Sequence, residues 1–124
     1  MDAAEQPAPA RDHTNFIWSR GVKFPRDPAI IQGKIRRLLR TNGYEAKEAE
    51  AALRVVRKDD VVVELGGGIG FMSTLVAKKR QVAAVHVFEA NPNLIPFIQS
   101  VHQANDITNA HVNNAILGSR KGQV

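Results

Sequence analysis

The chain has 124 residues, of which 44% are hydrophobic, as is typical of a single globular domain. It contains no cysteine and no apolar run long enough to span a membrane, which excludes disulfides, thiolate chemistry and a membrane-spanning helix. The first residues lack the charged-then-apolar form of a signal peptide, so the cytoplasm is the expected compartment. The formal net charge is +5, but the motifs and aromatic platforms of nucleic-acid-binding modules are missing, and no nucleic-acid partner is expected.

The sequence of the N-terminal part predicts a disordered lead, or N-terminal tail, followed by an extended segment. Residues 1–12 are rich in Pro and Ala without periodicity, which predicts a disordered lead. The dense apolar residues between Thr14 and Phe24 predict an extended segment that packs on the domain, with Gly21 as a break. We expect Trp18 to anchor this segment by packing.

Two helices are expected next. Asp27-Pro28 is typical of a helix start, because Asp accepts from first-turn N–H groups and Pro suits the first helical position. Asn42-Gly43 is typical of a helix end, and a second helix is expected from about Tyr44 to Arg57. Residues 13–58 are thus predicted to hold the extended segment and both helices.

Residues 59–124 alternate strands with helices. The expected order is strand Val61–Leu65, helix Phe71–Arg80, strand Ala84–Phe88, a helix from Asn91-Pro92 to about Gln103, and strand Ala110–Ala115. Such alternation favours parallel pairing. The predicted fold class is α/β, a partial doubly wound, Rossmann-like parallel sheet with strand order 3-2-1 and N-terminal helices.

The predicted sheet is partial because its first strand, Val61–Leu65, has no expected neighbour on its far side. A bare apolar edge of this kind favours pairing with another chain. The hypothesis is that these residues are the N-terminal part of a longer domain, which also leaves room for self-association through the open sheet edge.

The stretch E-L-G-G-G-I-G, from Glu64 to Gly70, follows the first strand. Glycines let the chain turn sharply and let a ligand approach closely. Dinucleotide-binding proteins use G-x-G-x-x-G, and here the third position of that pattern is Phe71. The spacing with Gly66, Gly68 and Gly70 instead resembles the first motif of the class I S-adenosylmethionine-dependent methyltransferases.

Two acids suit that cofactor. Glu64 could receive its ammonium group, directly or through water, and the N-terminus of the next helix favours its carboxylate. Glu89 ends the second strand about 20 residues later, where an acid accepts from ribose hydroxyls in nucleotide-binding folds. The alternative is a glycine turn beside two surface acids.

A narrower resemblance rests on four segments taken together. They are N-G-Y-E (42–45), the glycine motif, V-F-E-A-N-P (87–92) and H-V-N-N-A-I-L-G (111–118). In order and spacing they resemble the FkbM-type methyltransferases over roughly residues 22–122. The resemblance implies methyl transfer from S-adenosylmethionine, usually to an oxygen of a small-molecule or sugar-like acceptor. The chain departs from the pattern at Glu64, where Asp is common, and in lacking the later strands.

Two further residues have open roles. Glu45 either closes over the cofactor with Tyr44 or is only a first-turn helix acid. Asn114 is either a contact to the adenine edge or a polar residue at a strand end.

The sequence therefore predicts a methyltransferase fragment, inactive alone, with S-adenosylmethionine as cofactor and a small-molecule acceptor. No catalytic residue is assigned, because the general base is expected in the absent part. The histidines share no metal-ligand spacing, so no metal site is expected. The alternatives are a non-catalytic α/β module that binds a nucleotide or a protein, and an NAD-dependent oxidoreductase, which Phe71 disfavours.

Overall fold

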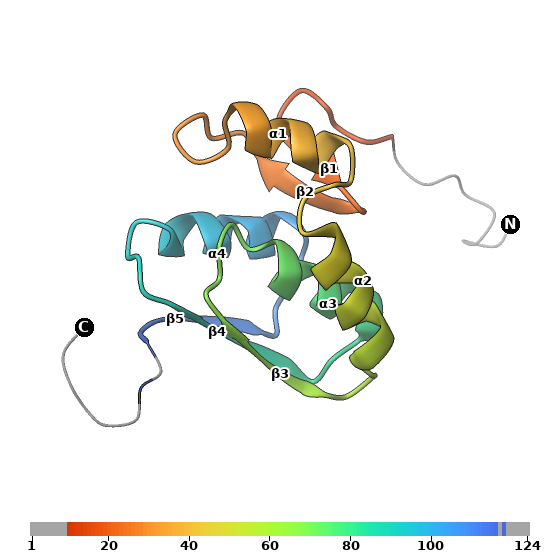
Figure 1. Ribbon diagram of the computed structural model, residues 1–124, viewed down its shortest axis with the longest axis vertical. Helices are drawn as coiled ribbons and strands as arrows, with labels where there is room; N and C mark the ends of the chain where they lie inside the picture. The colour runs from red at the N-terminus through yellow and green to blue at the C-terminus, as the bar shows by residue number, and fades with distance from the viewer. Residues whose placement is uncertain (1–9, 117, 119–124) are drawn as a thin grey trace, which may run out of the picture.

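The structure, a computed structural model, describes residues 10–116 and residue 118 (Figure 1). In chain order the elements are β1 (Phe16–Ser19), β2 (Val22–Pro25), α1 (Gly33–Arg40), α2 (Ala46–Val55), β3 (Val61–Leu65), α3 (Phe71–Arg80), β4 (Ala84–Glu89), α4 (Ile95–Ala104) and β5 (Ala110–Asn114). Residues 1–9 of the predicted lead (1–12), and residues 117 and 119–124 of the predicted segment 59–124, lie outside the described residues. Within the described part, no helix has the length and apolar character needed to cross a membrane, and the cytoplasmic location stays a prediction.

The extended segment at the N-terminus is a β-hairpin. β1 and β2 pair antiparallel, with Ser19 opposite Val22. The two turn residues, Arg20 and Gly21, both have positive φ, at 49° and 82°. Such a two-residue turn matches the twist of the flanking strands, which is why a break at Gly21 becomes a tight reversal.

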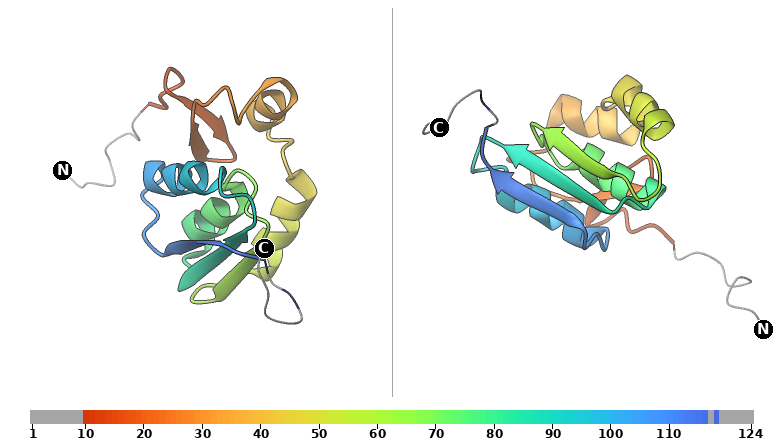
Figure 2. Two further views of the ribbon diagram at one scale, coloured as in Figure 1. Left: turned by 90° about the vertical axis from the view of Figure 1, so that its left-hand side faces the viewer. Right: turned by 90° about the horizontal axis from the view of Figure 1, so that it is seen from below.

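The later strands form a parallel sheet in the order β3-β4-β5. Figure 2 shows the helices on one face of this sheet and the other face open. Side chains on the covered face, such as Val85 and Val87, are 0% exposed. Side chains of β3 on the open face are not covered: Val61, Val63 and Leu65 are 63%, 55% and 64% exposed. The result is an α/β fold in which one layer of helices covers a parallel sheet.

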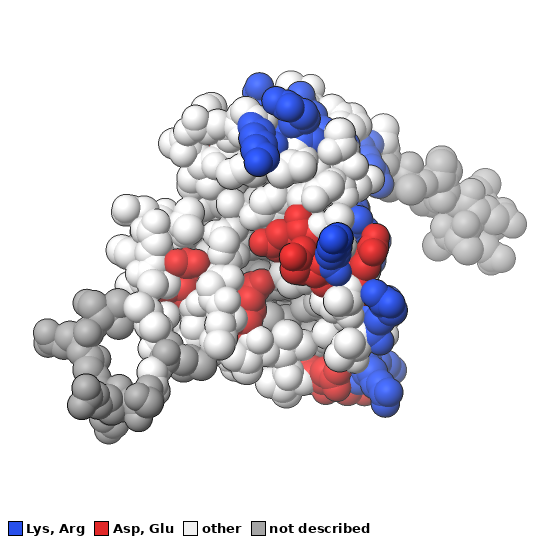
Figure 3. Space-filling model, viewed as in Figure 1, with Lys and Arg blue, Asp and Glu red and all other residues white. Residues whose placement is uncertain are grey.

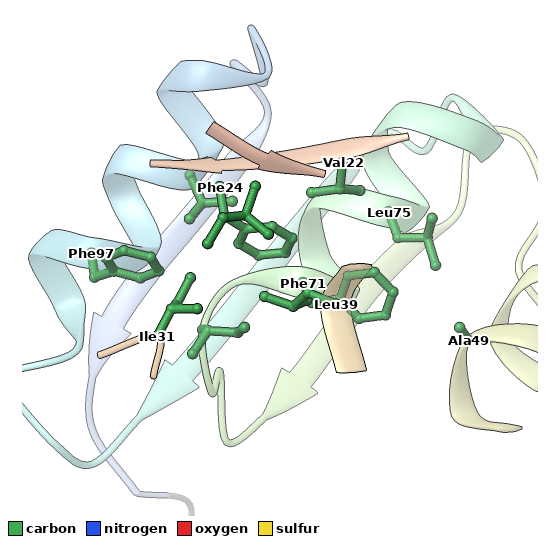
Figure 4. Packing of buried hydrophobic residues seen from close by; sticks show 11 residues of the cluster. Val22, Phe24, Ile31, Leu39, Ala49, Phe71, Leu75 and Phe97 are labelled. Carbon is green, nitrogen blue, oxygen red and sulfur yellow. The ribbon is translucent and has the colours of Figure 1, made fainter. Parts of the chain in front are cut away.

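The hairpin shares its core with the helices on the sheet. Val22 and Phe24 are fully buried, and the Phe24 ring lies 6.2 Å from that of Phe71 on α3 (Figure 4). The amide of Asn105 fixes the hairpin edge by accepting from the N–H of Lys23 at 3.0 Å and donating to its carbonyl at 2.8 Å. The hairpin is thereby held over α3 and α4. The predicted division at residue 58 stays a prediction.

The predicted start of the first helix is wrong. Asp27 does accept from the N–H of Ala29 at 3.0 Å, but this closes only one isolated turn, in which Ile31 donates to the Asp27 carbonyl. Gln32, which is extended at φ −126° and ψ 159°, separates that turn from α1, whose first residue is Gly33. The helix therefore begins six residues later than Asp27.

Two other helix starts also move toward the C-terminus. Glu45 has a left-handed φ of 45°, so α2 begins at Ala46 rather than at Tyr44. The Asn91 side chain accepts from the N–H of Asn93 at 3.0 Å and forms a local turn, so α4 begins at Ile95. In both places a side chain or backbone turn competes with the first helical turn.

Candidate cofactor site at the carboxyl ends of the strands

The glycine loop leaves β3 and enters α3. Gly66, Gly68 and Gly70 have φ of 81°, 55° and 82°, values that L side chains rarely adopt. Gly67 is required for another reason, because a Cβ there would lie 2.6 Å from Cγ1 of Val87. A Cβ on Gly66 would meet nothing within 4 Å, so the backbone there faces open space.

Glu89 joins this loop to the end of β4. Its side chain is 9% exposed. One carboxylate oxygen accepts from the N–H of Gly68 at 3.2 Å, and the other accepts from the N–H of Asn91 at 2.8 Å. The predicted acid and the predicted glycines are therefore in direct contact.

Glu64, near the end of β3, is half-buried, with one of its carboxyl oxygens in the interior. Its Oε1 is buried and makes no hydrogen bond within the described residues. Burial, and then the nearby charges of Glu45 and Glu89, raise the pKa of Glu64 to about 8. A buried oxygen without a hydrogen-bond partner is costly, so this position would favour a ligand that carries a positive charge or donates a hydrogen bond.

Tyr44 and Glu45 lie beside the loop, on the segment between α1 and α2. The Tyr44 ring packs edge-on against Phe71 at 5.6 Å, and its hydroxyl lies 3.7 Å from where a Cβ on Gly68 would be. Burial raises the pKa of Tyr44 to about 12, so the hydroxyl remains a hydrogen-bond donor. The Glu45 side chain caps no N–H of α2, and burial followed by Glu48 raises its pKa.

Asn114 lies opposite Glu89 in the register of β4 and β5. Its side-chain amide donates to the carbonyls of Glu89 at 2.9 Å and Ala90 at 3.0 Å. The amide donor thus holds the backbone that follows β4.

A cavity of about 300 Å³ opens between these strand ends, lined by Leu65, Gly66, Phe88, Glu89, Ala90, Ala115 and Ile116. The sequence analysis missed its apolar lining. The available signal was position, since Ala90 and Ala115 lie at the carboxyl ends of two predicted parallel strands, and these ends meet at one edge of the sheet. The cavity therefore offers an apolar wall beside the Glu89 carboxylate.

The site thus combines a glycine loop at a helix N-terminus, a backbone-bound carboxylate, an unpartnered carboxyl group and an apolar cavity. This set suits a ligand with a cationic end and a sugar. In the described part of the chain, no three metal-ligating side chains gather to hold a metal ion.

No protein-family model and no curated protein matches the sequence. The structure is similar to that of TYW2 from P. horikoshii, solved in complex with MeSAdo, with a TM-score of 0.63 and 22% identity over 82% of this chain and 35% of that one. It is also similar to M. jannaschii TYW2 in complex with AdoMet, with a TM-score of 0.62 and 18% identity over 86% of this chain and 45% of that one. A third similar structure is Trm5b from Pyrococcus abyssi, with a TM-score of 0.59 and 23% identity over 88% of this chain and 30% of that one.

The chain spans less than half the length of each of these three proteins. Identities this low show the fold rather than the activity. The chain therefore has the Rossmann-like fold of the class I S-adenosylmethionine-dependent methyltransferases.

Proposed function

We propose that this chain binds S-adenosylmethionine at the glycine loop and forms the cofactor-binding part of a methyltransferase. The observation that carries the proposal is the buried, unpartnered Oε1 of Glu64 beside that loop. The methionine end of the cofactor has an ammonium group, which would pair with Glu64 and satisfy this oxygen. The N-terminus of α3, at Gly70, would favour the neighbouring cofactor carboxylate.

Glu89 is proposed to bind the ribose. Each of its carboxylate oxygens accepts one backbone N–H and retains a lone pair for a hydroxyl. The fixed geometry means that little side-chain entropy is lost when the sugar binds. The two structures of TYW2 that hold AdoMet and MeSAdo support the choice of an adenosyl ligand.

The cavity beside Glu89 is proposed to take the adenine. Ala90 and Ala115 are small enough to let a flat ring enter, and Ile116 supplies an apolar wall. Asn114 contributes by holding the Glu89–Ala90 backbone in place. Glu45 is proposed to close over the methionine end together with Tyr44.

The acceptor is proposed to be a small-molecule or sugar-like compound methylated on oxygen, as the FkbM-type resemblance implies. When bound, the cofactor supplies an electrophilic methyl group on a sulfonium. The acceptor oxygen forms the new C–O bond as the C–S bond breaks, the acceptor proton goes to a general base, and S-adenosylhomocysteine is left. The residues of this chain position the cofactor, and positioning accounts for much of the rate in such a displacement.

The sheet is proposed to be the 3-2-1 half of a doubly wound sheet, completed next to β3 by further strands of a longer chain. The open face of β3 supports this proposal, because the helices that connect further parallel strands would cover Val61, Val63 and Leu65 there. The free edge of β3 supports the alternative, a non-catalytic module that binds a nucleotide or a protein. An NAD-dependent oxidoreductase is less favoured, because Phe71 is buried against Tyr44 and Phe24 where that motif needs glycine.

Calorimetric titration of the chain with S-adenosylmethionine, S-adenosylhomocysteine and NAD tests the proposal. Both adenosyl ligands are expected to bind, and Glu64→Gln is expected to weaken both. Glu50→Gln, a change of the same kind at an exposed residue of α2 that pairs with Arg20 of the hairpin, serves as the matched control. Binding of NAD alone would overturn the proposal, and binding of none of the three would favour a protein-binding module.

A further inference from the structure

The positive charge of the protein is concentrated in one layer. Residues 10–41, which we call the basic layer, hold eight Lys and Arg residues and two Asp residues. Residues 42–116 hold seven Lys and Arg residues against eight Asp and Glu residues. In Figure 3 the top of the molecule, over α1, shows Lys and Arg with no acid among them, whereas the lower part shows both signs. The hairpin and α1 therefore carry the net charge.

The charged side chains of α1 form no ion pair within residues 10–116. Lys34, Arg36, Arg37 and Arg40 are all exposed, and α1 has no acid in its first turn. Within residues 10–116, the one ion pair joins Arg20 to Glu50 at 3.7 Å. Four neighbouring cations without a protein partner repel one another, so they are best satisfied by an external anion.

Two hollows shape this surface. One, of about 440 Å³, is lined by Arg36, Arg37 and Arg40 on α1. The other, of about 450 Å³, lies between α1 and the hairpin, and its lining includes Arg11, Arg26, Phe16 and Trp18. Arg40 lines both hollows, so they lie next to each other on this surface.

Two aromatic rings on the outer face of the hairpin lie against cations. Phe16 and Trp18 are half-buried on the face opposite the core. The Lys23 ammonium lies 4.7 Å from the Phe16 ring, and the Arg11 guanidinium lies 5.0 Å from the Trp18 ring. Rings and guanidinium planes are the surfaces on which unstacked bases lie, while neighbouring cations hold the phosphates.

We propose that the basic layer binds a single-stranded nucleic acid along its phosphodiester backbone. The inference goes beyond the proposed function and stands without it. The end of α1 is also near the glycine loop in the chain, since Arg40 comes four residues before Tyr44, whose hydroxyl lies next to Gly68. The acids of that site would repel phosphate, so the strand is held on the basic side.

The observations favour a nucleic acid over an anionic membrane. A protein that lies on a membrane inserts apolar side chains beside its cations. The large apolar side chains that are exposed among the described residues are Val55, Val61, Val63, Leu65 and Ile116, and none belongs to the basic layer. The sequence alone did not predict a nucleic-acid partner, because composition does not show that the fold gathers these residues on one layer.

The test is fluorescence anisotropy of a labelled RNA of about 15 nucleotides, and of DNA of the same sequence, titrated with the whole chain at several salt concentrations. The test variant is Arg36→Gln/Arg37→Gln/Arg40→Gln. The matched control is Arg54→Gln/Arg57→Gln/Lys58→Gln, which removes the same charge from exposed residues outside the basic layer. Circular dichroism checks that both variants are folded.

The wild-type chain and the control variant are expected to bind RNA, DNA or both with a strong salt dependence. The test variant is expected to bind at least tenfold more weakly, and the slope of log K against log salt is expected to fall by about 2, since each lost phosphate contact contributes about 0.7. Equal losses in both variants would overturn the proposal. The absence of binding would also overturn it. So would phosphatidylserine vesicles that displace the labelled nucleic acid as well, per negative charge, as unlabelled nucleic acid does.

Discussion

The carboxylate of Glu89 accepts a hydrogen bond from the backbone N–H of Gly68 at 3.2 Å. This contact joins the end of β4 to the glycine loop that follows β3, across 21 residues of sequence. Its second oxygen binds the N–H of Asn91, so the side chain is fixed at both oxygens. The carboxylate is therefore oriented before any ligand arrives, which is the arrangement expected of a sugar-binding acid.

Binding of S-adenosylmethionine at neutral pH is predicted to release a proton from Glu64. The pKa of Glu64 is raised to about 8, mainly by burial, so the free protein holds that proton at pH 7. An ammonium group beside it favours the ionised form and expels the proton. Calorimetry in buffers of different ionisation enthalpy measures the release. Glu64→Gln is expected to abolish it, and an unchanged release in that variant would remove Glu64 from the site.

Glu64 is also predicted to lower stability as the pH rises. The native pKa of about 8 lies above the ordinary value of 4.5, so this stabilisation is fully present below pH 4.5 and is lost as the pH rises toward 8. Between pH 6.5 and 8, Glu64→Gln should flatten the decline in the free energy of unfolding measured by urea titration. A decline of equal slope in both proteins would contradict the buried, protonated state.

His102 is predicted to make the protein sensitive to acid. It lies buried on α4 with its Nε2 2.7 Å from Oγ of Ser73 on α3, and burial lowers its pKa to about 4. In the unfolded chain His102 becomes protonated near pH 6.5, whereas in the native state it stays neutral down to about pH 4. Stability is therefore lost as the pH falls from about 6.5 to 4. The loss is at most about 3 kcal/mol.

The difference in unfolding free energy between wild type and His102→Gln isolates this effect. It should change across that pH range, whereas His111→Gln, an exposed change on β5, should leave the profile of the wild type intact. A difference that is constant with pH would show that the His102 side chain is only a packing residue.

Gly67→Ala is predicted to destabilise the protein by about 1–3 kcal/mol through overpacking. The added methyl group would lie 2.6 Å from Cγ1 of Val87 and 2.9 Å from Cδ1 of Ile98. In a Val87→Ala background the same change should cost less, because the nearest atom is gone. A double-mutant cycle by urea unfolding measures the coupling. Fully additive effects would show that the loop adjusts elsewhere.

The open face of β3 is predicted to drive self-association. Val61, Val63 and Leu65 form an exposed apolar row on an unpaired edge strand. Sedimentation velocity should show association that grows with protein concentration and that Val63→Lys reduces. Val55→Lys, on α2 and 73% exposed, is the control and should have little effect. A monomer at all concentrations would contradict this prediction.

The sequence predicted the features that depend on strand and helix alternation. Val61–Leu65 and Phe71–Arg80 have the bounds that the apolar pattern predicted. The meeting of Glu89 with the glycine loop followed from parallel pairing alone, since parallel strands bring their carboxyl ends to one edge. Those inferences needed no side-chain detail.

The sequence could not predict features set by local backbone geometry or by what remains uncovered. The extended backbone of Gln32 separates α1 from the turn at Asp27, and nothing in the neighbouring residues indicates that conformation. The burial of the Glu64 oxygen without a hydrogen-bond partner depends on how the folded chain surrounds it, which no motif shows. The hairpin of residues 16–25 likewise depends on Asn105, which is far away in sequence.

The most direct test of the account is an NMR titration of the labelled chain with S-adenosylhomocysteine, followed at the backbone amides. The account predicts that Gly66, Gly68 and Ala90 shift together, and that Glu89→Ala weakens binding by about 1–3 kcal/mol as the ribose hydroxyls lose their acceptor. Shifts confined to other parts of the chain, or an unchanged affinity in Glu89→Ala, would contradict it.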